Sequence, residues 1–363
     1  MVHSDMTGLE RQPKQRFGRL KRCYFIARNI RSFLNKEREL SGVPATLSAL
    51  RLLKAGFHSD KRYLYERGPD GLPQNIYVGD FERLMKRRIN GEYGCFLDDK
   101  LLFNQAFSSF FRCPLNYGLI ESGRFSPLSA AFGAVSSDKP LSDPNLPGRF
   151  VLKRASGGGG KNIYLVVKET SNTFLVNGIV KTVAQLSAAI SESAYLATEL
   201  LTQGEYTHKL YPHSINTVRV VTMRDEQGPF VAFAVQRIGR ECSRPTDNLN
   251  RGGMAAAVDI DSGVLGDAKH YESFRKPESY SVHPETGAKI AGQCVPQWVA
   301  IKKQLLDAMR ALPALHYVGW DVVVQDDGFL VLEGNSYPGV QVAQLHYPLK
   351  SNPRIKAFFE RWV

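Results

Sequence analysis

The stretch Gly319-Trp-Asp321-Val-Val-Val-Gln325-Asp-Asp-Gly328-Phe-Leu-Val-Leu-Glu333-Gly-Asn335 carries the clearest structural signal in this chain of 363 residues. Its pattern predicts two short apolar strands around a tight turn. A three-residue loop, Asp326-Asp327-Gly328, suits a type I turn that glycine closes in the left-handed region. That register pairs Gln325 with Phe329 and therefore places Asp321 opposite Glu333 on one face of the hairpin.

The same register gathers oxygen ligands at the end of the hairpin away from the turn. Asn335 lies two residues beyond Glu333, so strand alternation returns it to the same face. Two carboxylates and an amide oxygen form a set that suits Mg2+, with Mn2+ as a second candidate, usually shared with nucleotide phosphates. A surface hairpin with solvated acids is the alternative, and the apolar strands argue against it. We therefore predict a metal site at Asp321, Glu333 and Asn335.

A glycine-rich segment upstream of this hairpin has the composition of an anion-binding loop. Phe150-Val-Leu-Lys153-Arg-Ala-Ser156-Gly-Gly-Gly-Gly160-Lys161-Asn-Ile-Tyr-Leu-Val-Val167 predicts a strand, a flexible loop and a second strand. Consecutive glycines let backbone amides approach an anion, and Lys153 and Lys161 add positive charge. This is no Walker A loop, because no Gly-Lys-Ser/Thr opens a helix. Alone, the glycine run is equally typical of a mobile hairpin tip. Together with the predicted metal site of the hairpin, it predicts an ATP-binding site.

These segments resemble the ATP-grasp superfamily in order and spacing from about residue 98 to 345. Further matching segments are Asp99-Lys100, Thr198-Glu199-Leu200-Leu201, Asn216-Thr-Val-Arg219, Gln236-Arg237 and Asp247-Asn248-Leu-Asn250-Arg251-Gly-Gly253. Several of them are similar to ribosomal-protein glutamate ligases, although Asn216 falls one residue away from the aspartate of that pattern. Asn-Thr-Val-Arg and Gly-Trp-Asp are most similar to the sugar-transfer-associated ATP-grasp branch.

The resemblance implies a role for each matching residue. Nucleotide phosphates would be bound by Lys100, Lys153, Ser156, Gly157, Gly158, Gly159, Gly160 and Lys161. Backbone groups of Glu199 and Leu201 would hold the adenine edge, and Glu205 would bind the ribose. Arg219, Arg237, Asn250 and Arg251 would be catalytic, and Asp321, Glu333 and Asn335 would be the magnesium ligands.

The fold implied by the resemblance is α+β, with two lobes that clasp ATP and a helical basic N-terminal region. The expected division is 1–97 for that region, 98–205 for the nucleotide-clasping lobe and 206–363 for the catalytic lobe. The implied activity is ATP- and Mg2+-dependent carboxylate–amine ligation through an acyl phosphate. Its substrates would be small molecules, with an amino acid and an acidic sugar or polysaccharide precursor as the candidate pair. A phosphotransferase acting on a hydroxyl, and a non-catalytic nucleotide-binding partner of a glycosyltransferase complex, are the alternatives. The identities of the substrates and the oligomeric state stay open at this stage.

Positive charge concentrates at the N-terminus. Residues 1–62 hold 14 Lys/Arg against 5 Asp/Glu, so +9 of the net charge of +12 lies there. Apolar residues recur within this arm at helical spacing: Phe17, Leu20, Tyr24, Ala27, Ile30 and Leu34. A helix docked on its own domain with a solvated basic face explains the pattern, and so does peripheral contact with an anionic membrane. Nucleic-acid binding is disfavoured, because no recognised motif accompanies the charge.

The five cysteines are dispersed and include no Cys-x-x-Cys pair. This pattern indicates neither a zinc site nor a disulfide framework and favours a reducing cytoplasm. No apolar run reaches the length of a membrane span, and no signal-peptide pattern opens the chain. We therefore expect a cytoplasmic protein, with the inner membrane face as one possible location.

Overall fold

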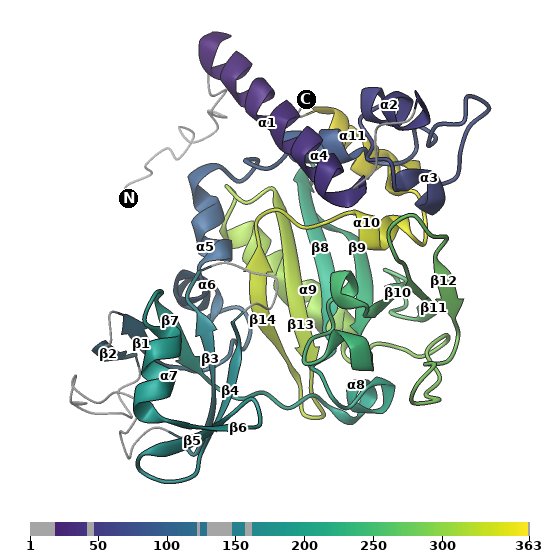
Figure 1. Ribbon diagram of the computed structural model, residues 1–363. Helices are drawn as coiled ribbons and strands as arrows, with labels where there is room; N and C mark the ends of the chain where they lie inside the picture. Colours follow the sequence, from purple (N-terminus) through teal and green to yellow (C-terminus); the bar gives the residue numbers. More distant parts are fainter. Residues whose placement is uncertain (1–18, 42–46, 122–123, 129–146, 157–161, 362–363) are drawn as a thin grey trace, which may run out of the picture.

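Two seven-stranded antiparallel sheets form the body of the molecule, which we describe from a computed structural model (Figure 1). The structure describes residues 19–41, 47–121, 124–128, 147–156 and 162–361. With helices around the sheets, the architecture is α+β, as the sequence predicts.

The first sheet has the strand order β2-β1-β7-β3-β4-β5-β6. Its strands are β1 (Asn116–Glu121), β2 (Arg124–Pro127), β3 (Arg149–Arg154), β4 (Tyr164–Lys168), β5 (Thr173–Val176), β6 (Ile179–Thr182) and β7 (Tyr195–Thr198). Helix α7 (Val183–Ile190) covers it and begins with a capping box in which Thr182 and Gln185 exchange hydrogen bonds. Leu186 and Ile190 of this helix join Phe150 in the core of the sheet.

The second sheet has the order β12-β11-β10-β9-β8-β13-β14. Its strands are β8 (Val218–Asp225), β9 (Gly228–Ile238), β10 (Met254–Val258), β11 (Leu265–His270), β12 (Glu278–Tyr280), β13 (Tyr317–Val324) and β14 (Phe329–Asn335). Every residue of β13 is buried, because the sheet is covered on both faces.

Helices α6 (Lys100–Phe107) and α9 (Trp298–Ala311) contribute to one core of this sheet, around Trp320. The other core contains α11 (Pro353–Arg361) and part of the N-terminal region. The remaining helices are α1 (Arg19–Ser41), α2 (Leu47–Lys54), α3 (Lys61–Leu64), α4 (Asp80–Met85), α5 (Cys95–Asp98), α8 (Glu205–Leu210) and α10 (Gln341–Gln344). Short 3-10 turns are η1 (Gly91–Gly94), η4 (Glu241–Ser243), η5 (Leu249–Arg251) and η6 (Leu349–Ser351). Figure 1 shows α1 to α4 at one end of this sheet and the first sheet beside β14.

The β13–β14 hairpin keeps the predicted pairing of Asp321 with Glu333 but reaches it by a different route. The predicted three-residue turn is wrong, because Val324 pairs with Phe329 and the Gln325 N–H donates to the Gly328 carbonyl. This tighter turn shifts the register by one residue. A β-bulge at Leu332 adds one residue to β14 and restores the Asp321–Glu333 pair.

Helix α1 docks on its own chain, but not through the apolar stripe that the sequence suggests. Its buried residues are Asn29, Phe33 and Glu37. The Phe33 ring stacks on His58 at 4.5 Å, and Glu37 accepts a hydrogen bond from the Ser59 N–H. Two of the three docked residues are therefore polar, and the docked stripe follows the spacing i, i+4, i+8.

The apolar stripe itself lies largely in solvent. Tyr24 is 71% exposed, Ile30 45% and Leu34 41%. Phe17 and the side chain of Leu20 lie outside the described residues. Among the described residues, no helix is both long and apolar enough to cross a membrane.

The predicted division at residues 97 and 205 remains a prediction. Strands of the first sheet run from Asn116 to Thr198, and those of the second from Val218 to Asn335. The segment from α5 to β1 packs away from the first sheet, since Leu97, Phe103 and Phe107 lie in the core around Trp320.

Candidate functional site

Asp321 lies at the centre of a buried charge cluster on the second sheet. Strand β8 pairs with β13 so that Arg219 stands directly opposite Asp321. The Arg219 guanidinium binds this carboxylate through Nε and through Nη2, the latter at 2.8 Å. Arg237 of β9 donates from Nη1 to both carboxylate oxygens, at 3.3 and 3.2 Å. Burial would raise the pKa of Asp321, but the two arginines outweigh it and hold that pKa below its usual value.

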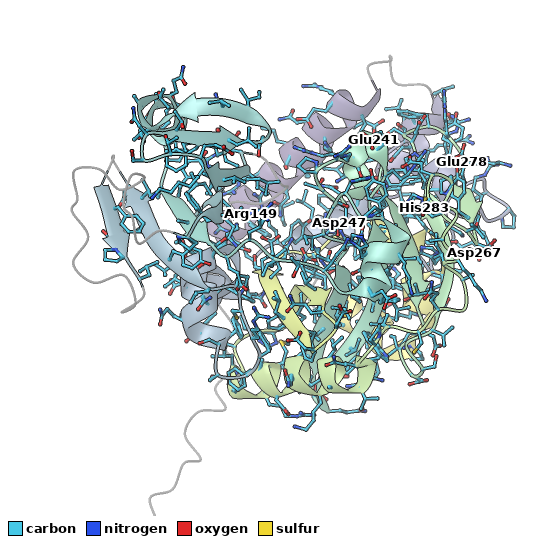
Figure 2. All side chains as sticks on the ribbon, turned by 90° about the horizontal axis from the view of Figure 1, so that it is seen from below. Arg149, Glu241, Asp247, Asp267, Glu278 and His283 are labelled. Atoms are coloured by element: carbon cyan, nitrogen blue, oxygen red, sulfur yellow. The ribbon has the colours of Figure 1, made fainter. Side chains whose placement is uncertain are left out.

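Asp247 extends this cluster and was not singled out from the sequence. Its Oδ1 accepts from Arg237 Nη2 at 2.5 Å, and its Oδ2 accepts from the Thr217 N–H and hydroxyl. In the view of Figure 2 it lies between Arg149 of the first sheet and His283, which follows β12. Asp247 opens the Asp-Asn-Leu-Asn-Arg segment that resembles the ATP-grasp pattern, and this was the sequence signal for it. Its pairing with Arg237 could not be predicted from neighbouring residues.

Glu333 forms its ion pair with a lysine, whereas Asp321 is bound by arginines. Lys100 Nζ lies 3.7 Å from its carboxylate, and the Lys100 N–H donates to the carbonyl of Ala155 at the end of β3. Burial, followed by the charge of Lys100, lowers the pKa of Lys153 to about 8, while Glu333 acts in the opposite direction. The structure therefore brings Lys100, Lys153 and Glu333 together where the two sheets meet.

Glu333 and Asn335 suit a hard cation better than Asp321 does in this arrangement. Glu333 has a lysine at ion-pair distance, whereas both oxygens of Asp321 are bound by guanidinium groups. The Asn335 Oδ1 atom accepts the N–H of Tyr337 and keeps a second lone pair. Among the described residues there is no cluster of three or more His, Cys, Asp or Glu side chains with metal-binding geometry. A carboxylate and an amide oxygen shared with phosphates remain a donor set that fits Mg2+.

The segment after β7 holds the predicted adenine contacts. The N–H of Glu199 is already bonded to the carbonyl of Leu115, and its carboxylate accepts from the Leu115 N–H and from Arg112. Of its backbone groups, the carbonyl is therefore the one left for adenine. The N–H of Leu201 makes no hydrogen bond with other described residues.

Arg112, which sequence reasoning missed, bridges this segment to the hairpin turn. It donates to Glu199 and to Gln325, each at 2.6 Å. Gln325 in turn donates to the carbonyl of Thr202. The segment after β7 is thus fixed to the turn of the β13–β14 hairpin.

The other predicted site residues lie in α8, in η5 and just after β3. Glu205 begins α8, is exposed and pairs with Lys209 at 2.6 Å. Asn250 accepts from the Tyr271 hydroxyl, and Arg251 is exposed beside it in η5. Ser156 forms an isolated bridge with Asp99, whereas Gly157 to Gly160 and Lys161 lie outside the described residues.

These features define a protein of the ATP-grasp class, and comparison with known sequences places it within that class. The chain belongs to the sugar-transfer associated ATP-grasp family, whose sequence profile matches residues 81–358. No curated protein matches the chain.

Solved structures with a similar fold include several ligases. D-alanyl-alanine synthetase A from Vibrio cholerae O1 biovar eltor is 10% identical, with a TM-score of 0.44 over 80% of this chain and 69% of that chain. D-cycloserine synthetase DcsG is 12% identical, with a TM-score of 0.39 over 78% and 79%. L-amino acid ligase from Bacillus licheniformis is 10% identical, with a TM-score of 0.38 over 77% and 51%. The chain spans about half the length of this ligase and of two further solved structures that it matches, a ribonucleotide synthetase and a biotin carboxylase.

Proposed function

We propose that this chain is an ATP- and Mg2+-dependent ligase that joins a carboxylate to an amine through an acyl phosphate. The observation that carries the proposal is the junction of the two sheets, where Lys100, Lys153 and Glu333 meet beside Arg219 and Asp321. Phosphate-binding cations and metal-binding oxygens are both needed to transfer a phosphoryl group between anions. Membership of the sugar-transfer associated ATP-grasp family supports the same assignment.

ATP would lie along the junction of the sheets. Lys100, Lys153 and Ser156 would bind its phosphates together with Gly157, Gly158, Gly159, Gly160 and Lys161. The carbonyl of Glu199 and the N–H of Leu201 would hold the adenine edge, and Glu205 would have to leave Lys209 to reach the ribose.

Glu333 and Asn335, with Asp321, would hold Mg2+, which would supply positive charge to neutralise the phosphates. Asp321 also fixes Arg219 and Arg237 in place. Each guanidinium has five N–H donors, so both keep donors for a substrate oxyanion while they bind Asp321.

The proposed reaction has two steps. A carboxylate oxygen of the first substrate attacks the γ-phosphorus of ATP, which releases ADP and forms an acyl phosphate. The amine of the second substrate then attacks the acyl carbon, so that inorganic phosphate leaves and a proton is lost from nitrogen. Arg219 and Arg237 would stabilise the acyl phosphate oxygens, because a guanidinium fork suits an oxyanion well. Asn250 and Arg251 would contact the acceptor.

An acidic sugar or polysaccharide precursor joined to an amino acid is the substrate pair that we propose. The family description associates the chain with sugar transfer. Phosphate transfer to a hydroxyl is the competing outcome, since the same phosphate-binding residues would serve a kinase.

Hydroxylamine trapping separates these outcomes. We expect a carboxylate substrate, ATP and Mg2+ to release ADP and, with hydroxylamine, to form a hydroxamate. The Arg219→Ala variant should form it at least about 100-fold more slowly, a loss of roughly 3 kcal/mol of transition-state stabilisation. Transfer of phosphate to a hydroxyl, without hydroxamate under any condition, would contradict ligation and establish the kinase.

We also propose that the protein works in the cytoplasm and touches the anionic face of a membrane through α1. The exposed side of this helix carries Tyr24 and Leu34 among the exposed Arg28, Arg31 and Arg38. Aromatic and aliphatic groups interleaved with arginines suit the headgroup region of a membrane.

A further inference from the structure

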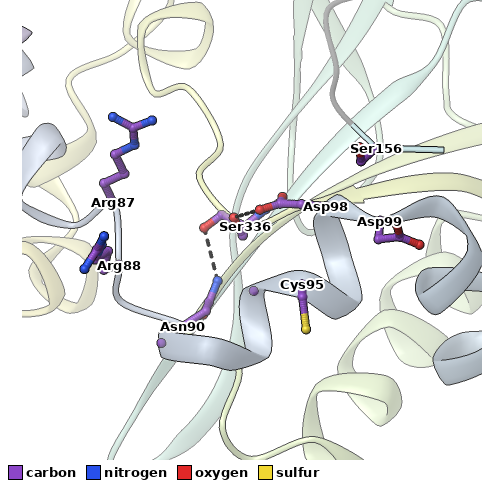
Figure 3. A pocket seen from close by; sticks show the side chains of 10 residues that line it. Arg87, Arg88, Asn90, Cys95, Asp98, Asp99, Ser156 and Ser336 are labelled. Carbon is purple, nitrogen blue, oxygen red and sulfur yellow. Dashed lines mark hydrogen bonds between the residues drawn. The ribbon is translucent and has the colours of Figure 1, made fainter. Parts of the chain in front are cut away.

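A cavity of about 420 Å3 opens beside the proposed phosphate site (Figure 3). Three residues of its lining are chain neighbours of proposed site residues. Asp99 precedes Lys100, Ser336 follows Asn335, and Ser156 precedes the glycine run. A molecule in this cavity would therefore lie next to the reacting phosphate, if the proposed function holds.

Two arginines form one side of the cavity. Figure 3 shows Arg87 and Arg88 on one side, Ser156 and Asp99 on the other, and Ser336 between them. Both arginines are exposed, and neither guanidinium group makes a hydrogen bond or ion pair with another described residue. They follow α4 and lie outside the segments that sequence reasoning singled out.

The two acids of the lining are already engaged by donors of the protein. Asp98 accepts from the N–H and the hydroxyl of Ser336, at 3.0 and 2.6 Å. Asp99 Oδ1 caps α6 by accepting from the N–H groups of Leu101 and Leu102. The groups left to a ligand are therefore mainly the donors of Arg87 and Arg88.

The arginine side of the cavity is tied to the strand that carries Asn335. Asn90, which is 4% exposed, donates to the carbonyls of Tyr317 and Ser336 and accepts from the N–H groups of His316 and Tyr317. Its four hydrogen bonds hold the turn after Arg88 against β13 and the end of β14.

Arg83 connects the same two parts of the chain, α4 and the segment after β14. It stacks over the Tyr337 ring at 3.8 Å and donates to the carbonyls of Tyr337 and Pro338. The position of Arg87 and Arg88 relative to Asn335 is thus fixed by packing, as a substrate-binding site requires.

We propose that this cavity binds the oxyanion group of the substrate, a carboxylate or a phosphate, with Arg87 and Arg88 as its ligands. Guanidinium groups recognise both anions through paired hydrogen bonds. The inference rests on the proposed function for its place in the reaction, and it names the substrate class as acidic.

The test is a calorimetric titration of the full chain with D-glucuronate and, separately, with inorganic phosphate, each with and without saturating ADP and Mg2+. D-glucose is the matched neutral probe. We expect the wild type to bind at least one anion and not glucose, and the probe that binds tells carboxylate from phosphate. The Arg87→Ala/Arg88→Ala variant should bind that anion at least about tenfold more weakly, and the double lysine variant should retain part of the affinity.

Arg51→Ala/Arg67→Ala is the matched control, because both arginines are exposed in the same region and outside the cavity lining. ADP affinity within twofold of wild type shows that each variant is folded. Equal anion binding by the Arg87/Arg88 variant, or no anion binding by the wild type, would overturn the inference. Failure of ADP to bind the wild type would instead count against the proposed function, and the titrations without ADP would still decide the anion site.

Discussion

Burial lowers the pKa of Lys153, whereas a bound phosphate group would raise it. With a pKa of about 8, its side chain loses its proton in a range where most lysines keep it. Bound ATP would favour the charged form, so binding should take up a proton near pH 8. The affinity should be complete below pH 8 and fall as pH rises through it, by at most about tenfold per pH unit for a single proton.

Calorimetry at pH 7.5 and 9.5, in buffers of different ionisation enthalpy, measures both effects. Lys153→Met should remove the proton uptake near pH 8. Identical pH profiles for the variant and the wild type would show that Lys153 is not the titrating group.

Glu333 and Asp321 form one cross-strand pair but should respond differently to loss of charge. Glu333 is partly exposed and forms its ion pair with Lys100 at 3.7 Å, so Glu333→Gln should change stability by no more than about 1 kcal/mol. Turnover should nevertheless be abolished. Asp321 is buried between two arginines, so Asp321→Asn should lower the free energy of unfolding by about 3 kcal/mol.

Urea unfolding and ADP release, measured on both variants, test this contrast. An active Glu333→Gln enzyme at limiting Mg2+ would refute the metal assignment. The pairing of these acids follows from strand alternation, whereas their partners do not, because Arg219 lies 102 positions from Asp321.

At the scale of elements, the segment between β7 and α8 contacts the turn of the β13–β14 hairpin at Gly204. A Cβ atom there would lie 2.7 Å from the Gln325 carbonyl carbon and 2.8 Å from the Asp326 nitrogen. Gly204→Ala should therefore displace the hairpin tip and destabilise the protein by about 1–3 kcal/mol. Gly148→Ala is the control, because no atom lies within 4 Å of its Cβ position. Equal unfolding midpoints for the two variants would exclude a close contact between Gly204 and the turn of the hairpin.

Helix α1 offers a second test at this scale, because its docked and exposed sides can be changed separately. Tyr24→Ser/Leu34→Ser should reduce sedimentation with phosphatidylglycerol vesicles severalfold and leave the melting temperature unchanged. Phe33→Ala should lower stability by about 3–5 kcal/mol, since this side chain is 5% exposed. Binding should weaken with salt, and it should be absent with neutral vesicles. Equal sedimentation of wild type and the double variant would contradict membrane contact through this surface.

These two elements also show what the sequence could and could not predict. Apolar periodicity predicts that α1 is a helix, but its docked stripe contains Asn29 and Glu37, whose partners lie in distant segments. Similarly, the alternation of residues predicts the two strands of the hairpin. The bulge at Leu332 could not be predicted, because the Asp-Asp-Gly motif does not determine the length of the turn.

At the scale of the molecule, the ATP-grasp fold is recognisable from the sequence because its motifs are local and follow a fixed order. The contacts that join the parts are not local. Phe103 and Phe107 pack on Trp320, more than 200 positions away, and Arg112 reaches both Glu199 and Gln325. The cavity beside Arg87 and Arg88 likewise combines segments from residue 87 to residue 336, so no single motif could reveal it.

We propose that ATP binds where the two sheets meet, with Lys153 on its phosphates. Calorimetric titration of wild type, Lys153→Met and Lys181→Met with Mg-ATP at pH 7.5 measures this directly. Lys181 is the control, because it lies on β6 at the far edge of the same sheet. We expect one ATP per chain, an affinity loss of roughly 1.5–3 kcal/mol for Lys153→Met and no change for Lys181→Met. Unchanged ATP affinity in Lys153→Met would exclude an ATP site with Lys153 on the phosphates.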